Sequence, residues 1–362
     1  MTSENGSKVQ LADEFIFAGI RPRVIFGFGA ISATAAEVQR LGRSRALVVS
    51  TPNQERAAQA LAQSLGTLAA GVHAHAREHT PVDVSEAAVA LFKDLQADCV
   101  VALGGGSTIG LAKAIATRTG ADQLVIPTTY AGSEMTDILG EVSEGQKTTT
   151  RDPSILPETV IYDVDLTMRM PKALTATSAL NAMAHAIEAL YAPDRNPLTS
   201  LVSIEAVRSF CEALPVLAED PHNRPGRKAA LYGAWLCGIA LGGVSMSLHH
   251  KICHTLGGAF ATPHAATHAI MLPHTTSFNN GAVPELLAPL HPFLGINPGV
   301  GLFDLAGGIG APTRLADYGL SEADLDRAAE LATQNPYANP RPITREAVRQ
   351  MLQQAWRGTR PD

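Results

Sequence analysis

Six of the twelve histidines in this chain lie close together in the stretch LHHKICHTLGGAFATPHAATHAIMLPH (248–274). Histidine is the commonest metal ligand and the usual carrier of protons near neutral pH. His250 and His254 are four residues apart and therefore share one face of a helix, and the same spacing relates Asn181 to His185. Pairing of this kind, repeated in separate helices, indicates either a metal centre or a proton-transfer site.

A third predicted helix begins at His264, so that Asn181, His185, His250 and His264 could converge on one point. Their number and chemistry suit a divalent metal, with one exception. Such a cation prefers an anionic oxygen among its ligands, and Asn181 offers only a neutral amide. We therefore expect weakened metal binding at this set. We interpret the other histidines of interest as core or surface residues; these are His249, His268, His274, His73, His75 and His79.

A run of three glycines is the strongest cofactor signal. Gly104–Gly105–Gly106 comes directly after the apolar strand predicted at 98–103 and directly before a predicted helix. Glycines in this position let the backbone approach a pyrophosphate, and the helix N-terminus offers free N–H groups to its charge. Ser107 is placed to cap that helix and to touch the phosphates. A tight turn is the alternative, but it seldom needs three glycines, and the fragment Gly27–Phe28–Gly29 is weaker evidence of the same kind.

Hydroxyl side chains follow the next apolar strand, LVIP (124–127). Thr128, Thr129 and Ser133 come after it, at the carboxyl edge where open α/β sheets bind their ligands. A hydroxyl-rich turn explains the same residues equally well. After the strand at 46–50, residues 51–53 contain no acid that would hold a ribose 2′-hydroxyl and repel a 2′-phosphate. We therefore expect the site to accept NADPH as well as NADH.

The elements that must position these residues fall into two groups. Up to residue 165, short apolar runs alternate with helical patterns, which predicts a Rossmann-like parallel sheet with helices on both faces. The expected strands are 23–27, 46–50, 71–75, 98–103, 124–127 and 159–164, and the expected helices are 31–42, 53–65, 82–96 and 108–117. A hairpin is expected at 141–150, turning on Glu144–Gly145.

From Pro171 onward the periodicity is helical, with almost no strand signal. The clearest helical patterns are 173–192, 200–214, 226–243 and 345–358, whereas 297–313 is predicted to form glycine-rich turns. We therefore predict an α/β dinucleotide-binding domain at 1–165 and an all-helical substrate and catalytic domain at 166–362.

Composition excludes several classes of function. The net charge is −6 and no basic run stands out, so the chain has no footprint for nucleic acid. The four cysteines are scattered and predicted to be reduced. The N-terminus is polar and not typical of a signal peptide, and no membrane span is expected. The sequence thus predicts a soluble cytoplasmic protein.

Seven segments occur in the order and spacing of the iron-containing alcohol dehydrogenase family, which the chain resembles from about Phe15 to Gly358. They are FGFGA, GGGST…AKAIA, PTT…SEMT, LTATSALNAMAHAIEALY, LHHKICHTLGG, TPHAATHAIMLPH and NPRPIT. The resemblance implies a dehydroquinate synthase-like architecture and a homodimer. It places the family's metal ligands on Asn181, His185, His250 and His264, and a further active-site histidine on His254. It places nicotinamide-dinucleotide contacts on Gly104, Gly105, Gly106, Ser107, Thr128 and Thr129.

Within that family, LHHKICHTLGG and the NA-x-AH-x-x-EALYA segment most resemble the branch that reduces maleylacetate. The resemblance implies reduction of the C=C bond of maleylacetate, or substituted maleylacetates, to 3-oxoadipate with NADH or NADPH in aromatic-compound degradation. Two departures from the family, asparagine at 181 and an inserted Tyr130, both fit this branch.

The predicted roles follow from this resemblance. We expect His254 and His250 to act as proton donor and enolate stabiliser, with His185 and His264 shaping the site. The dicarboxylate substrate would be bound by Lys251, Tyr130 and Asn181, with Arg151 and Lys147 as weaker candidates. A metal is not expected to be required.

Three alternatives remain open at this stage. The first is an iron- or zinc-dependent alcohol or polyol dehydrogenase of the same family. The second is a lyase like the dehydroquinate synthases, which would need a complete metal site and basic residues around a phosphate. The third is a non-catalytic nucleotide-binding module, which the cluster of histidines argues against.

Overall fold

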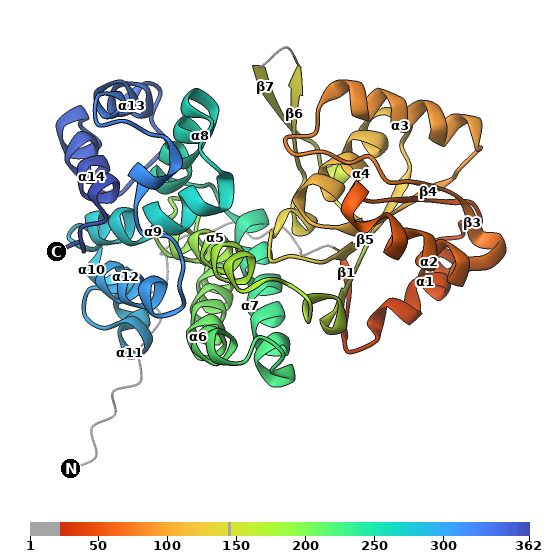
Figure 1. The fold of residues 1–362 in the computed structure, drawn as a ribbon, viewed down its shortest axis with the longest axis horizontal. Coiled ribbons are helices and arrows are strands. Elements are labelled where there is room, and N and C mark those ends of the chain that lie inside the picture. Colours follow the sequence, from red (N-terminus) through yellow and green to blue (C-terminus); the bar gives the residue numbers. More distant parts are fainter. Residues whose placement is uncertain (1–21, 144–145) are drawn as a thin grey trace. The chain divides into compact units, whose positions relative to one another are not determined.

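The computed structural model describes residues 22–143 and 146–362, apart from the side chains of 146 and 147 (Figure 1). The described chain divides into two compact units, residues 22–169 and Met170–Asp362. The polar N-terminal segment and the turn Glu144–Gly145 of the expected hairpin lie outside the described residues.

The first unit, here called the α/β unit, is built on a six-stranded sheet in the order β1-β8-β5-β4-β2-β3. All neighbouring strands are parallel. The strands are β1 Arg23–Gly27, β2 Ala46–Val49, β3 Ala69–His73, β4 Cys99–Gly104, β5 Asp122–Pro127 and β8 Thr159–Asp163. The apolar runs therefore predicted five of these strands, because a parallel sheet covered on both faces needs nearly continuous apolar strands. The weaker pattern predicted at 71–75 corresponds to β3, which begins two residues earlier and is only partly buried.

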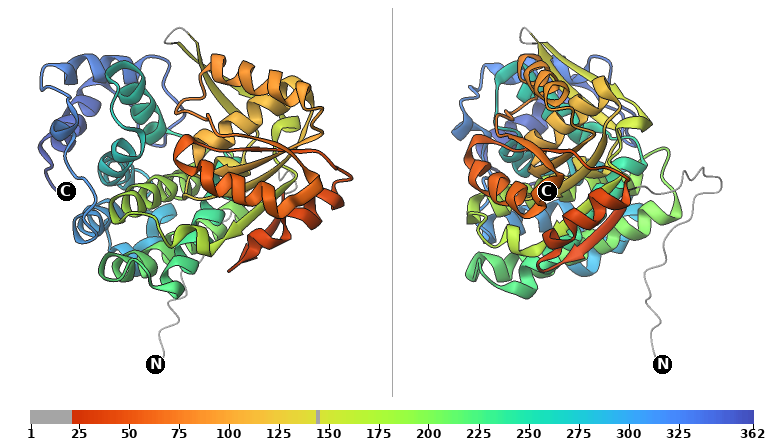
Figure 2. Two further views of the ribbon diagram at one scale, coloured as in Figure 1. Left: turned by 45° about the vertical axis from the view of Figure 1, so that its right-hand side comes forward. Right: turned by 90° about the vertical axis from the view of Figure 1, so that its right-hand side faces the viewer.

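Helices cover both faces of the sheet (Figures 1 and 2). Val38 of one helix and Ala58 and Leu61 of the next pack on the sheet side chains of Val48 and Val101. The helices of this unit are α1 Thr34–Arg40, α2 Glu55–Leu65, α3 Val82–Asp94 and α4 Gly106–Thr119. Short 3-10 helices are η1 Ala30–Ala33, η2 Pro52–Gln54, η3 Gly66–Leu68, η4 Ser133–Met135, η5 Pro153–Ile155 and η6 Val164–Thr167. The antiparallel strands β6 Ile138–Ser143 and β7 Gln146–Arg151 confirm the predicted hairpin.

The second unit, here called the helical unit, contains only helices among its described elements. They are α5 Lys172–Tyr191, α6 Pro197–Glu219, α7 Arg224–Gly243, α8 Leu248–Phe260, α9 His264–Asn280, α10 Pro284–Leu287, η7 Ala288–Leu290, α11 His291–Leu294, α12 Pro298–Gly308, η8 Leu315–Tyr318, α13 Asp324–Thr333 and α14 Arg345–Arg357. Helix α5 is buried along almost its whole length, with α6, α7 and α9 packed around it. Its many alanines allow these neighbours a close approach.

The prediction of glycine-rich turns at 297–313 is wrong for α12. Asn297 caps this helix by accepting a hydrogen bond from the Gly299 N–H, and Pro298 occupies its first turn. A Cβ at Gly299 would collide with the backbone of Pro273 and Ser277, and one at Gly301 with the backbone of Leu294. The glycines therefore serve close helix packing rather than turning of the chain.

One segment of the helical unit, Pro284–Gly308, is long and apolar enough for a membrane span by length and composition alone. It is divided into α10, η7, α11 and α12, and leucines from several of these pieces are buried in the core. A single spanning helix would need continuous backbone hydrogen bonding, which this broken segment does not have.

Candidate active site

The glycine run lies at the carboxyl end of β4, where the chain enters α4. Gly105 precedes the helix in an extended conformation, and its carbonyl accepts hydrogen bonds from Thr108 N–H (3.0 Å) and Ile109 N–H (3.1 Å). No side chain among the described residues caps this helix. The first N–H groups of a 14-residue helix are therefore available to an anion, as a dinucleotide phosphate requires.

The three positions of the run require glycine for different reasons. A Cβ at Gly104 would collide with Thr108 and lie 3.0 Å from Gln54 Oε1, and one at Gly105 would lie 2.9 Å from Thr129 Oγ1. Packing inside the protein therefore excludes a side chain at these two positions. Gly106 is exposed, and its nearest neighbour would be Ala131 Cβ at 3.9 Å. Gly106 is the position left open to an approaching ligand.

Gln54 joins the loops at this edge, although sequence reasoning missed it. Its Nε2 donates to Thr128 Oγ1 at 2.9 Å, and Thr128 N–H donates to the Gly104 carbonyl at 3.0 Å. The ends of β2, β4 and β5 are thus tied together. The only sequence signal for Gln54 was its place just after a strand, at the edge where ligands bind.

A buried lysine, also missed from sequence, fixes the loop that carries Ser133. Lys113 is 1% exposed, and its Nζ donates to the carbonyls of Ser133 (2.6 Å), Thr136 (2.6 Å) and Ile138 (3.0 Å). Burial lowers the pKa of Lys113 to about 7, against the attraction of Glu134. These bonds hold the loop after β5 in one conformation.

Two sequence candidates in the α/β unit have surroundings that bear on their predicted roles. Tyr130 is fully buried, and its contact with a substrate stays a prediction. At the first glycine fragment, the carboxylate of Asp163 accepts hydrogen bonds from Gly29 N–H (3.1 Å) and Ile31 N–H (2.9 Å). An internal anion already occupies those amides, so this loop is not available to a phosphate.

The histidine cluster lies within the helical unit, on three helices. Helix α5 carries Asn181 and His185, α8 carries His250 and His254, and α9 begins at His264. Ring centroids are 5.0 Å apart for His185 and His250, and 6.0 Å apart for His250 and His254. The structure thus brings His185, His250 and His254 together, as the sequence spacing predicted.

His268, which we interpreted as a core residue, is both buried and part of this cluster. Its ring centroid lies 4.4 Å from that of His264 and 5.1 Å from that of His250. Four buried polar atoms of the cluster have no hydrogen-bond partner among the described residues; they are Asn181 Oδ1, His185 Nδ1, His250 Nε2 and His268 Nε2. Buried polar atoms are rarely left unpaired, so these four mark a place for a bound group.

Glu188 is the most informative residue that sequence reasoning missed. It is fully buried, and its Oε2 accepts from His250 Nδ1 and Ser247 N–H at 2.7 Å each. Its Oε1 accepts from His249 N–H, also at 2.7 Å. Nδ1 of His250 donates to this carboxylate, and its Nε2 has no hydrogen-bond partner among the described residues. A signal was present, since Glu188 lies seven residues after Asn181 and so on the same side of α5.

Most of the buried imidazoles are held neutral. Burial lowers the pKa of His185, His249 and His268 well below the ordinary value, and repulsion from neighbouring imidazoles lowers it further. His250 differs from these three rings because its Nδ1 pairs with the carboxylate of Glu188 at 2.7 Å.

The three basic side chains predicted to bind the dicarboxylate substrate lie in different surroundings. Lys251 is partly buried, and its Nζ lies 5.7 Å from the ring centroid of Tyr337. Arg151 is largely exposed and pairs with Asp137 at 3.4 Å. The side chain of Lys147 lies outside the described residues.

The donor set can be compared with what a divalent metal needs. Three imidazoles and an amide oxygen, from His185, His250, His264 and Asn181, are acceptable ligands for a borderline cation. The pairing of His250 with Glu188 also has the form usual behind metal-bound histidines. The set fits a metal in kind, but it contains no anionic oxygen, because the carboxylate of Glu188 accepts hydrogen bonds from His250, His249 and Ser247 instead.

Comparison with known proteins identifies relatives over nearly the whole chain. Residues 21–164 match the family described as iron-containing alcohol dehydrogenase, and residues 175–356 match the Fe-containing alcohol dehydrogenase family, C-terminal. Maleylacetate reductase of Rhizobium sp. (strain MTP-10005) is 55% identical, covering 96% of this chain and 99% of that protein. Maleylacetate reductase 1 of Rhodococcus opacus is 49% identical, covering 97% and 98%.

Solved structures show the same likeness. The crystal structure of maleylacetate reductase from Agrobacterium tumefaciens has a TM-score of 0.95 and 56% identity, covering 97% of this chain and all of that chain (100%). A 1,3-propanediol oxidoreductase has a TM-score of 0.86 at 24% identity and shares the fold.

Proposed function

The chain belongs to the iron-containing alcohol dehydrogenase family, and on that premise we propose that it is a maleylacetate reductase. The likeness that carries this proposal is identity of 55% to such a reductase over nearly the full length of both proteins. The enzyme is an oxidoreductase that uses a nicotinamide dinucleotide to reduce the C=C bond of maleylacetate.

The reaction divides into a hydride step and a proton step. Maleylacetate is a 4-oxo-2-enedioate, and hydride from the reduced nicotinamide adds to the alkene carbon β to the ketone. The electron pair of the alkene moves to give an enolate, with charge on the ketone oxygen. A proton then adds to the carbon next to the ketone, which gives 3-oxoadipate and the oxidised nicotinamide. The protein must therefore stabilise an oxyanion and supply one proton.

His250 is our candidate for the proton donor. Its Nδ1 is hydrogen-bonded to the buried carboxylate of Glu188 at 2.7 Å, and this carboxylate stabilises the imidazolium that donates from Nε2. After transfer, the ring is neutral and keeps its Nδ1–H bond to Glu188. The other candidate, His254, then stabilises the enolate oxygen by hydrogen bonding, while His185 and His264 shape the pocket.

The enzyme works without a metal in our proposal. An enolate is a weaker base than the alkoxide that an alcohol dehydrogenase must hold, so hydrogen-bond donors suffice for it. A bound cation would be held by Asn181, His185, His250 and His264, and would supply electrophilic stabilisation of an oxyanion. The neutral Asn181 lowers the affinity for such a cation.

The dinucleotide binds at the carboxyl edge of the sheet, with its phosphates at the N-terminus of α4. Gly106 and Ser107 contribute the N–H groups, and Thr128, Thr129 and Ser133 lie on the adjoining loops. Both NADH and NADPH serve as reductant, because residues 51–53 contain no carboxylate to repel a 2′-phosphate. The enzyme is a cytoplasmic homodimer that acts on small dicarboxylates from aromatic-compound degradation.

Deuterium labelling tests this reaction directly. NADH carrying deuterium at the transferred position should give 3-oxoadipate with the label on the carbon β to the ketone. Reaction in deuterated water with ordinary NADH should label the carbon next to the ketone. Reduction of the ketone to a hydroxyl group, or oxidation of simple alcohols in preference to maleylacetate reduction, would show an alcohol dehydrogenase instead.

A further inference from the structure

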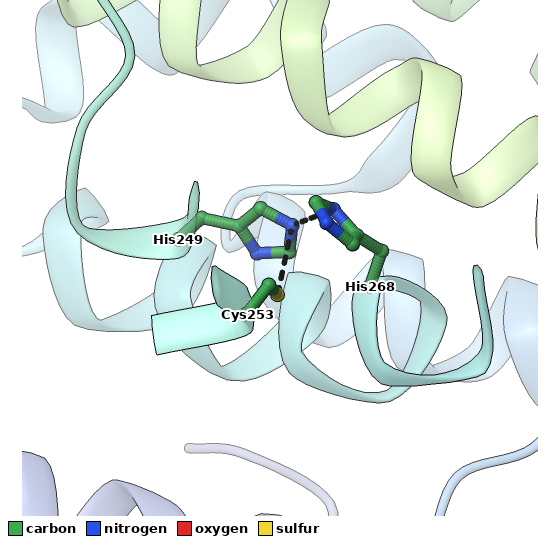
Figure 3. Close-up of side chains that lie close together, drawn as sticks. All are labelled: His249, Cys253 and His268. Carbon is green, nitrogen blue, oxygen red and sulfur yellow. Dashed lines mark hydrogen bonds between the residues drawn. The ribbon is translucent and has the colours of Figure 1, made fainter. Parts of the chain in front are cut away.

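A buried chain of hydrogen bonds lies within the histidine cluster. His249 Nδ1 is 3.0 Å from Thr275 Oγ1, and His249 Nε2 is 2.9 Å from His268 Nδ1 (Figure 3 shows the second contact). Thr275 and His249 are fully buried, and His268 is 1% exposed. None of these three residues has a part in the reaction proposed above.

The direction of these hydrogen bonds follows from Thr275. Its hydroxyl has one proton, which is directed to the carbonyls of Met271 (3.0 Å) and Leu272 (3.2 Å) one turn earlier. Thr275 therefore accepts from His249, so His249 carries its proton on Nδ1. The Nε2 of a neutral His249 is then an acceptor, and His268 must donate to it from Nδ1. The proton of His268 is thereby fixed on Nδ1, which leaves Nε2 with a lone pair.

We propose that Thr275 and His249 form a tautomer lock that holds Nε2 of His268 as a hydrogen-bond acceptor in the active site. That Nε2 is buried and has no hydrogen-bond partner among the described residues. The chain ends at a fully buried threonine, so it does not carry protons to solvent. Its effect is to fix which ring nitrogen of His268 is the acceptor.

The lock adds an acceptor to the histidine cluster. Asn181 Oδ1 is also a buried acceptor without a partner among the described residues. Together with His268 Nε2 it favours a bound group that donates hydrogen bonds. The His264 and His268 ring centroids are 4.4 Å apart, so a group that donates to this acceptor would be held beside His264. His268 is therefore a positioning residue, and this role rests on the proposed function for its catalytic consequence.

The same atoms could be considered as a metal site, since His249, Cys253 and His268 offer three buried ligand atoms within 4.8 Å of one another. Two nitrogen ligands of one tetrahedral zinc are about 3.3 Å apart. The nitrogens of His249 and His268 are only 2.9 Å apart, which is a hydrogen-bond distance. Burial also raises the pKa of the Cys253 thiol well above its usual range, so the sulfur keeps its proton. The geometry therefore favours the hydrogen-bonded chain.

Nitrogen-15 NMR of histidine-labelled, metal-free protein tests the lock without any substrate. We expect the neutral Nδ1–H tautomer for both His249 and His268 in the wild-type protein. In T275V this preference should be lost, and kcat for maleylacetate should fall about 3- to 10-fold, the worth of one hydrogen bond. The KM for NADH should stay unchanged, because the cofactor residues lie in the α/β unit.

Two matched variants separate this role from simple packing. T275S keeps the hydroxyl and should restore both the tautomers and kcat. Thr276 is the next residue on the same helix and is equally buried, but its hydroxyl has no partner in the described structure. T276V should therefore leave kcat unchanged.

An Nε2–H tautomer at either histidine in the wild-type protein, or a wild-type kcat in T275V, would overturn the proposal. Zinc retained by the wild-type protein in stoichiometric amount and lost in C253A would overturn it in favour of a metal site. Failure of the wild-type protein to reduce maleylacetate would contradict the proposed function and leave the tautomer result standing.

Discussion

Replacing Glu188 with glutamine tests the Glu188–His250 pair most sharply. The carboxylate accepts three buried N–H bonds at 2.7 Å each, from Ser247, His249 and His250. A glutamine amide has one oxygen, so its NH2 group must face at least one of these donors. Two donors then face each other and are left without acceptors, and each buried donor without an acceptor costs about 1–3 kcal/mol. We therefore expect E188Q to lose about 2–4 kcal/mol of unfolding free energy.

The catalytic loss should exceed what this destabilisation explains. Without the carboxylate, His250 loses the partner that fixes its tautomer and stabilises its imidazolium, and kcat should fall about 10- to 100-fold. Urea denaturation would give the unfolding free energy, and steady-state NADH oxidation at a temperature where E188Q is folded would give kcat. In a double-mutant cycle with H250N, the second substitution should cost little further activity.

A control and a refuting result are available for this prediction. Glu212 is exposed and pairs with Arg208 on the surface, so E212Q should change the unfolding free energy by less than about 1 kcal/mol and leave kcat unchanged. Wild-type kcat in folded E188Q, or additive effects of E188Q and H250N, would refute the view that the two residues act as one unit.

Three further changes have expected outcomes. Burial lowers the pKa of His274 to about 4 from its ordinary value of 6.5. Between these two pH values the unfolded chain binds a proton that the folded protein does not, so the unfolding free energy should fall as the pH falls. Between pH 8 and pH 5, urea titrations should show that H274N loses about 2 kcal/mol less unfolding free energy than the wild type does. K113M removes the donor that holds the Ser133 loop, so fluorescence titration should show several-fold weaker binding of NADH. Lys93 is exposed, so K93M should bind NADH as the wild type does. N181D restores an anionic oxygen and should raise the affinity for zinc or iron at least 10-fold by calorimetry; equal affinity in both proteins would show that charge at this position does not decide metal binding.

The sequence was informative where one residue type had one dominant physical reason. Continuous apolar runs predicted the parallel sheet, because both of its faces are covered. The i, i+4 spacing predicted the histidine cluster, because such pairs must share a helix face. The glycine run was correctly placed at the end of β4, although Gly104 and Gly105 are required by Thr108 and Thr129 rather than by a ligand.

What sequence reasoning missed depends on contacts between residues distant in the chain. Glu188 receives donors from residues about sixty positions later, and nothing local distinguishes it from an exposed helical glutamate. Lys113 has the same ambiguity, because its partners lie in the loop after the next strand. Helix α12 was missed since the glycines that allow its close packing resemble turn residues when only the sequence is read.

Turnover by metal-free protein is the measurement that tests the central claim most directly. The protein would be dialysed against a chelator, its metal content determined, and NADH absorbance followed with maleylacetate in the same preparation. We predict that metal-free protein oxidises NADH at its full rate, and that added zinc or iron does not increase it. Loss of activity on chelation, with recovery only when iron or zinc is restored, would contradict the account, because Asn181 would then be a working ligand of a catalytic metal.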